Sequence, residues 1–224
     1  MASKKQAPEP IFLTVLTGFL GSGKTTILNW LLKDQAFSNA LVIVNEFGDV
    51  GLDHLFVESV DEQMIEMSSG CLCCTIRGDL STTLEGLLRD RDNDRIKKFD
   101  RVIIETTGLA DPAPILQTLI RHPYLSLRFH LNAVITTIDC EHGMATLDRH
   151  EEAVKQLAMA GHLVITKTDL DTIDPKDRAA LETRITALNP SAKRLSNKSK
   201  DLRAAFLSKN SYQPDLDNPD IDQW

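Results

Sequence analysis

One glycine-rich segment constrains the fold of this chain more than any other feature. Residues 18–25 read G-F-L-G-S-G-K-T, which fits the pattern G-x-x-x-x-G-K-[ST], and they directly follow the apolar, β-branched run 11–17. Residues 26–32, after the pattern, have the composition of a helix. A strand, a glycine-rich turn and a helix in this order predict a phosphate-binding loop, because such a turn aims backbone N–H groups at phosphate oxygens.

Each residue type in this loop has a chemical role. The glycines let the backbone turn inward, Lys24 adds a mobile cation, and the Thr25 hydroxyl is a ligand for Mg²⁺. The residues expected to bind the phosphates are Gly18, Gly21, Ser22, Gly23, Lys24, Thr25 and Thr26. The alternative, an accidental glycine-rich turn, is disfavoured by the strand before it and the helix after it.

Composition and charge exclude several other classes of function. A chain of 224 residues with 42% hydrophobic residues can bury one α/β core. Its net charge of −7, without a long Lys/Arg cluster, argues against nucleic acid and anionic membranes as partners. The sequence has neither a signal-peptide core nor a run of roughly 18 apolar residues. Four cysteines do not make a secreted disulfide framework, so we expect a cytoplasmic protein whose clustered thiols are ligands.

Apolar, β-rich runs alternate with helical patterns along the chain. The expected strands are 11–17, 41–45, 101–106, 133–139 and 163–166, and the expected helices are 26–32, 80–89, 113–120, 151–160 and 176–188. Segment 46–70 fits this scheme poorly, apart from a short strand at 64–67. The alternation predicts an α/β fold, the three-layer P-loop NTPase fold with a mainly parallel central sheet. Its ligands are expected at the carboxyl ends of the strands.

The expected strand 101–106 supplies an acidic residue for the phosphate site. The sequence I-I-E-T-T-G ends this strand, and Glu105 is expected to organise Mg²⁺ and water near the γ-phosphate. Gly108 follows three residues later, where its backbone N–H can approach the γ-phosphate and move when that phosphate leaves. Lys24, Glu105 and Gly108 form the predicted catalytic set. The alternative is a strand-terminal Glu that faces solvent.

The identity of the base is predicted from T-K-T-D at 166–169. The Asp169 carboxylate can accept hydrogen bonds from guanine N1–H and the N2 amine, whereas adenine has an acceptor at N1 and lacks that amine. The aliphatic part of Lys167 is expected to lie over the ring. Many GTPases have Asn where Thr166 stands, so one amide is missing here. An ordinary surface turn is the alternative.

Three cysteines are clustered in the sequence C-L-C-C. Cys71, Cys73 and Cys74 are close enough to share one soft cation, for which zinc is the simplest candidate, with cobalt, copper or nickel as alternatives. Glu46 and Asp49 follow the second expected strand, where a P-loop GTPase has its first switch loop. We expect these two to reach either Mg²⁺ or the cysteine-bound metal. A redox pair of Cys71 with Cys74 and a tightly packed loop of small side chains are the alternatives.

Five motifs in the order T-G-F-L-G-S-G-K-T-T, N-E-F-G-D, G-C-L-C-C, E-T-T-G-L-A-D-P-A-P and T-K-T-D resemble the CobW-like metal-chaperone GTPases of the SIMIBI class. The resemblance covers about residues 11–169. It implies a G-domain fold, slow hydrolysis of GTP to GDP and phosphate, and transfer of a metal, commonly zinc or cobalt, to a client. It places the family's phosphate loop on 18–26, its metal ligands on Cys71, Cys73 and Cys74, and its second switch on 105–108.

Members of this family typically continue into a smaller C-terminal α/β domain, often after a His-rich linker. We therefore expect this chain to be a G domain from a longer protein. The expected parts are a flexible N-terminus at 1–10, a P-loop GTPase domain at 11–208, and a flexible tail or truncated linker at 209–224. Some relatives place an additional Glu where this chain has Val44, so its metal ligands can differ from theirs.

The sequence thus predicts a GTPase that binds a transition metal through its C-x-C-C motif and couples metal transfer to the nucleotide state. The expected ligands are GTP or GDP, Mg²⁺, and Zn²⁺ or Co²⁺. The expected partners are a metalloprotein client and, as an option, a second copy in a homodimer.

Two alternatives stay open. One is a metal- or nucleotide-binding module that does not hydrolyse, because no Gln or Arg is evidently placed to drive turnover. The other is a P-loop small-molecule kinase, which has no use for T-K-T-D.

Overall fold

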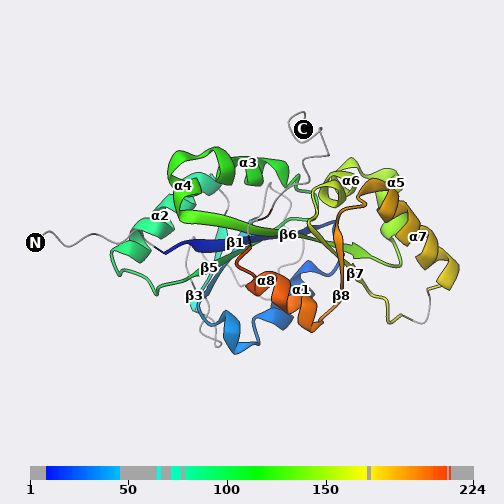
Figure 1. Ribbon diagram of the computed structural model, residues 1–224, viewed down its shortest axis with the longest axis horizontal. Coiled ribbons are helices and arrows are strands. Elements are labelled where there is room, and N and C mark those ends of the chain that lie inside the picture. Colours follow the sequence, from blue (N-terminus) through cyan, green and yellow to red (C-terminus); the bar gives the residue numbers. More distant parts are fainter. Residues whose placement is uncertain are drawn as a thin grey trace, which may run out of the picture.

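A central sheet separates two layers of helices (Figure 1). The computed structural model describes residues 9–45, 65–66, 72–76, 79–170, 173–210 and 212, with the backbone alone for 45, 65–66 and 72–76. The strands are β1 (Ile11–Gly18), β2 (Ala40–Asn45), β3 (Ile65–Glu66), β4 (Leu72–Ile76), β5 (Arg101–Thr106), β6 (Phe129–Asp139), β7 (His162–Thr166) and β8 (Lys193–Ser196). The helices are α1 (Lys24–Leu31), α2 (Leu80–Asp92), α3 (Ala113–Arg121), α4 (Pro123–Arg128), α5 (Gly143–Arg149), α6 (Glu151–Ala158), α7 (Pro175–Leu188) and α8 (Lys200–Leu207), with a 3-10 turn at Gln35–Phe37.

The strands run in the order β3-β4-β2-β5-β1-β6-β7-β8. Every described pairing is parallel except that of the edge strand β3 with β4, which is antiparallel. This confirms the predicted α/β fold with a mainly parallel central sheet. The carboxyl ends of parallel strands meet at one edge, so this topology brings the segments that follow β1, β5, β6 and β7 together.

Both faces of the sheet are buried, which explains why its strands read as continuous apolar runs. In β5, Val102 and Ile104 pack into a core with helices α2, α3 and α4, whereas Ile103 between them packs with α1 and α8. A third core joins α5, α6 and α7 beyond β6. The predicted apolar face of the second expected helix is confirmed, since Leu80, Leu84, Leu87 and Leu88 are all buried in α2.

The elements β8 and α8 were not expected from the sequence. Strand β8 has the sequence K-R-L-S with one buried residue, Leu195, so it lacks an apolar pattern. Helix α8 is held against the sheet by Arg101, a buried residue of β5 whose guanidinium donates to the carbonyls of Phe206 and Leu207. Long-range contacts of this kind leave no local signal in the sequence.

Tyr212 also docks on the sheet. Its backbone N–H donates to the Leu131 carbonyl at 2.8 Å, and its hydroxyl donates to the Met159 carbonyl at 2.8 Å. Burial raises the pKa of this hydroxyl to about 12. Among the helices that the structure describes, none has the length and apolar content needed to cross a membrane.

Candidate functional site

The glycine-rich segment forms a tight loop between β1 and α1. Gly18, Gly21 and Gly23 have φ angles of +140°, +69° and +93°, a backbone region that glycine adopts without strain. Gly18 is also confined by space, because a Cβ there would lie 2.3 Å from the Thr137 hydroxyl oxygen. The backbone needs glycine at these positions to make the turn that the phosphate-binding pattern predicts.

Lys24 folds back over this loop. Its ammonium donates to the carbonyls of Gly18 at 2.8 Å and Phe19 at 3.1 Å. Burial lowers the pKa of Lys24 to about 8, against the attraction of the Glu105 carboxylate. The cation therefore lies inside the loop, where phosphate oxygens are expected.

Thr25 and Glu105 meet at the carboxyl ends of β1 and β5. The Thr25 hydroxyl donates to Glu105 Oε1 at 2.6 Å. Glu105 is only 5% exposed, and burial raises the pKa of its carboxyl, although the Thr25 hydrogen bond and Lys24 oppose this. Hard oxygen donors of these two kinds, one hydroxyl and one carboxylate side by side, fit Mg²⁺. Thr26, the next residue of α1, is exposed.

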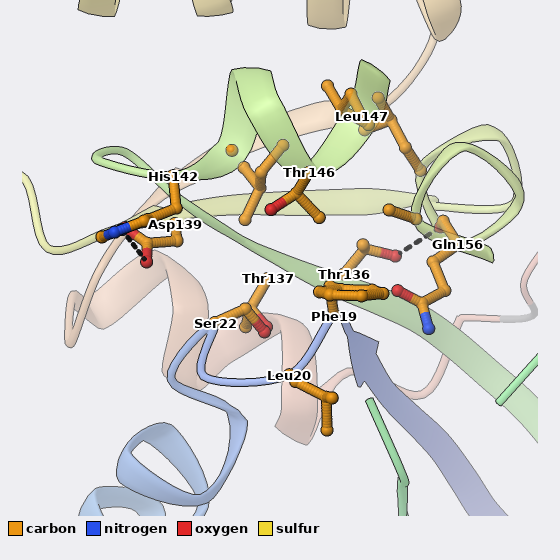
Figure 2. Close-up of a pocket in the computed structure, with 14 residues that line it drawn as sticks. Phe19, Leu20, Ser22, Thr136, Thr137, Asp139, His142, Thr146, Leu147 and Gln156 are labelled. Carbon is orange, nitrogen blue, oxygen red and sulfur yellow. Dashed lines mark hydrogen bonds and ion pairs between the residues drawn. The ribbon is translucent and has the colours of Figure 1, made fainter. Parts of the chain in front are cut away.

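Two hydroxyls fasten the phosphate loop to neighbouring strands. Ser22 Oγ lies 2.6 Å from Thr137 Oγ1 of β6 (Figure 2). The Thr166 hydroxyl, at the end of β7, donates to the Ser22 carbonyl at 2.7 Å. Thr166, which we expected beside the base, thus contacts the phosphate loop in this structure, and the Ser22 hydroxyl is engaged with β6.

The rest of the T-K-T-D motif lies at the same edge. Lys167 has a positive φ of +56°, and its ammonium forms an ion pair with Asp139 Oδ2 at 2.6 Å. Burial tends to raise the pKa of the Asp139 carboxyl, but the hydrogen bonds from Lys167 and the Glu141 N–H outweigh it and hold that pKa below its usual range. Asp169 is exposed in the turn that follows.

Gly108 brings the loop after β5 against the phosphate loop. A Cβ on Gly108 would lie 2.4 Å from the Leu20 backbone nitrogen and 2.6 Å from its Cα. Any side chain would therefore force the two loops apart. Beside this contact lies a cavity of about 30 Å³, lined by Phe19, Leu20, Thr136, Gln156 and others (Figure 2).

The predicted metal ligands are only partly described. Glu46, Asp49 and Cys71 lie outside the described residues, and only the backbone of Cys73 and Cys74 is described. We expected these two cysteines on a loop, but their backbone belongs to strand β4. The segment L-C-C-T-I lacks turn-forming residues and pairs in parallel with β2, which accounts for the difference.

The register of the sheet relates β4 to the phosphate site. Cys74 is paired with Ile43 of β2, and Ile43 is in turn paired with Ile104 of β5, the residue before Glu105. Since neighbouring strands lie roughly 4.8 Å apart, the backbone of Cys74 lies about 10 Å from that of Ile104.

Sequence reasoning missed several polar residues at this edge. Thr137 and Asp139 contact the phosphate loop and Lys167, and both lie in an expected strand that looked purely structural. Asn197 follows β8, and its Oδ1 is buried without a hydrogen-bond partner among the described residues. Strand β8 pairs with β7 and so places Asn197 near the end of β7. The sequence of β8 has no apolar pattern from which this strand could be predicted.

Comparison with known proteins gives consistent matches. The family profile described as "CobW/HypB/UreG, nucleotide-binding domain" matches residues 12–196. The zinc chaperone YjiA of Escherichia coli is 40% identical over 161 residues, covering 72% of this chain and 50% of that protein. Zinc-regulated GTPase metalloprotein activator 1 of Schizosaccharomyces pombe is 35% identical over 169 residues, covering 72% of this chain and 40% of that protein.

Solved structures agree with these matches. The Zn(II)-bound YjiA GTPase from E. coli superimposes with a TM-score of 0.71 at 32% identity, covering 95% of this chain and 70% of that one. HypB from Helicobacter pylori in complex with nickel shares the fold, with a TM-score of 0.55 at 17% identity. The chain spans about half the length of the curated relatives it matches.

Proposed function

Because the chain belongs to the CobW/HypB/UreG nucleotide-binding-domain family, we propose that it is a GTPase domain that binds a transition metal and couples its transfer to the nucleotide state. One observation carries this proposal. Lys24 and Thr25, which end the phosphate loop, meet Glu105 and Gly108, which lie about 80 residues further along the chain at the end of β5. A switch that responds to the γ-phosphate needs a cation, two oxygen ligands for Mg²⁺ and a backbone N–H that can move.

In this proposal the loop between β1 and α1 holds the phosphates. Backbone N–H groups of residues 18–26 and the Lys24 ammonium bind phosphate oxygens. Thr25 and Glu105 would hold Mg²⁺, which neutralises charge on the β- and γ-phosphates when bound. Lys24, Glu105 and Gly108 remain the proposed catalytic set. Burial shifts the charge equilibrium of two of them, since it lowers the pKa of Lys24 and raises the pKa of Glu105.

The base is proposed to bind at the ends of β7 and β8. Asp169 reads the N1–H and N2 amine of guanine, and the stem of Lys167 covers the ring. Thr166 supports this region indirectly, by fixing the Ser22 carbonyl. Guanine is therefore the proposed base, with GTP and GDP as ligands.

Zinc is the proposed cargo, with cobalt as the second choice. The curated relatives named above include a zinc chaperone and a zinc-regulated metalloprotein activator, and sulfur ligands favour such metals. We propose Cys71, Cys73 and Cys74 as ligands, assisted by Glu46 or Asp49. The separation of about 10 Å between the backbones of β4 and β5 is short enough for one switch segment to reach both cations. A metalloprotein client would receive the metal.

The experiment that tests this function is phosphate release under Mg²⁺, with GTP or ATP as substrate and with or without Zn²⁺. We predict release from GTP in large excess over ATP, and its loss in Lys24→Ala. Thr183→Ala, on the exposed face of α7, serves as the control and should retain wild-type turnover. Tight GTP binding without release would indicate a non-hydrolysing module instead. Equal use of ATP and GTP would contradict the guanine assignment and favour a kinase.

A further inference from the structure

A buried amide makes two hydrogen bonds to the loop that follows β5. Gln156 of α6 is fully buried, and its Nε2 donates to the Gly108 carbonyl at 3.0 Å and the Ala110 carbonyl at 2.9 Å. These two carbonyls flank Leu109, whose side chain is 51% exposed and so adds little packing to the loop. The Gln156 amide therefore adds two hydrogen bonds to the turn that the Ala110 N–H makes with the Thr107 carbonyl.

The orientation of this amide is fixed by its neighbours. Rotating it by 180° would place Oε1 against two carbonyl oxygens, so Nε2 must face the loop. Oε1 is buried and has no hydrogen-bond partner among the described residues. The two hydrogen bonds that Nε2 donates offset the cost of burying this oxygen. Gln156 lines the cavity beside the phosphate loop (Figure 2).

Helix α6 is in turn fixed to the centre of the sheet. The Thr136 hydroxyl of β6 donates to the Gln156 main-chain carbonyl at 2.8 Å. One residue earlier, the Lys155 ammonium lies 3.4 Å from Asp111 Oδ2, a second contact between α6 and the same loop. The chain of contacts thus runs from β6 through α6 to Gly108.

Gly108 is the point where this chain of contacts meets the phosphate loop. The glycine lies directly against the Leu20 backbone, with no room for a side chain. A shift of the Gln156 amide would therefore change the distance between Gly108 and the phosphate loop.

We propose that Gln156 is a positioning residue for recognition of the γ-phosphate. Its amide holds the Gly108 N–H where that phosphate binds, and movement of Gly108 away from the phosphate loop requires both hydrogen bonds to break. This proposal rests on the proposed GTPase function. Gln156 lies in α6, outside all five sequence motifs, and in this proposal it contributes to the discrimination between GTP and GDP.

The test compares Gln156→Met with a matched control, Asn189→Leu. Methionine keeps the length of the side chain and its helix propensity but donates nothing. Asn189 is also a buried amide bound to the α6 region, where its Nδ2 donates to the carbonyls of Leu157, Ala158 and Ala160. Among the described residues, none of its side-chain hydrogen bonds is to the loop after β5. Both variants thus lose a buried amide near α6, and only one loses the hold on Gly108.

Dissociation constants for GDP and for a non-hydrolysable GTP analogue are measured for each protein with Mg²⁺ present. For Gln156→Met we expect affinity for the analogue to fall roughly tenfold, the effect of losing one or two hydrogen bonds, while GDP affinity changes far less. Asn189→Leu should keep the wild-type ratio of the two constants. An unchanged ratio in Gln156→Met, or an equal change in Asn189→Leu, would overturn the proposal.

Hydrogen exchange of nucleotide-free protein supplies a readout that does not depend on GTP. The amides of residues 108–111 should exchange faster in Gln156→Met than in wild type, and at the wild-type rate in Asn189→Leu. Unchanged exchange there would also overturn the positioning role. If the wild-type protein itself does not distinguish GDP from the analogue, the proposed function fails, whereas the exchange result still decides whether Gln156 holds the loop.

A second variant covers the case in which Gln156→Met does not fold. In Gln156→Glu only the protonated carboxyl can donate, so the preference for the GTP analogue should recover as the pH falls. A purely structural role predicts no such recovery, and a pH-independent ratio at the wild-type value would contradict the inference.

Discussion

At the scale of single residues, the site depends on charges that are buried next to one another. Lys24 and Glu105 lie on adjacent segments, and burial disfavours the charged form of each. Nucleotide phosphates and a divalent cation are the ligands that relieve this cost, because each offers an opposite charge. Structural residues of a buried core seldom combine such shifts, which is why this pair marks a functional site.

The pKa of Lys24 leads to a pH prediction. Phosphate binding needs the ammonium, so affinity for GTP should fall about tenfold per pH unit above pH 8. Arg in Lys24→Arg stays charged in this range, so the nucleotide affinity of that variant should not change with pH. Nucleotide titrations across this range provide the measurement, and a flat wild-type profile would contradict the assignment.

The same pKa affects folding stability in a definite direction. Folding lowers the pKa of Lys24 from 10.5 to about 8, so the unfolded chain binds more protons between these values. The contribution of Lys24 to the free energy of unfolding therefore rises with pH over that interval. Below about pH 8 the lysine is charged in both states and its destabilising effect is fully present.

At the scale of elements, strands β6 and β7 act as a frame for the phosphate loop. Thr137 and Thr166 each extend a hydroxyl from a strand end to the loop at Ser22. The turn with three positive φ angles is thus held from outside, and helix α1 begins at a fixed place.

Thr166→Val tests this frame, because valine keeps the shape of threonine and removes the hydroxyl. The Ser22 carbonyl loses its donor in a buried position, which should lower the free energy of unfolding by about 1–3 kcal/mol. Affinities for GDP and a GTP analogue should fall by the same factor, since the whole loop is loosened. Denaturant unfolding measures the first effect, and an unchanged midpoint in Thr166→Val would contradict it; Thr183→Val on the exposed face of α7 is the control.

Helices and strands with a strong pattern of apolar residues could be predicted from the sequence. Elements and contacts that depend on distant segments could not. The buried strand at 101–106 and the leucine face of α2 were found with their residues correct, because each carries its own apolar pattern. Strand β8 and the partners of Asp139 depend on contacts between distant segments. Gln156 reads as an ordinary polar position in a helix, and nothing local shows that it is buried against two carbonyls.

At the scale of the whole molecule, the parallel sheet brings separate motifs to one edge. Glu105 is in register with Leu16 of β1, two residues before Gly18, and β2 links β5 to the cysteine-bearing strand β4. One set of hydrogen-bonded strands therefore spans the phosphate site and the proposed metal region. Coupling between the two ligands needs a two-state segment that responds to both of them.

The most direct test of this coupling is the Zn²⁺ affinity of the protein in three states, nucleotide-free, bound to GDP, and bound to a GTP analogue with Mg²⁺. The account predicts the tightest zinc binding with the GTP analogue, loss of zinc binding in Cys73→Ala, and loss of the nucleotide effect in Lys24→Ala. By linkage, zinc must tighten binding of the analogue by the same factor. Equal zinc affinity in all three states would contradict the account.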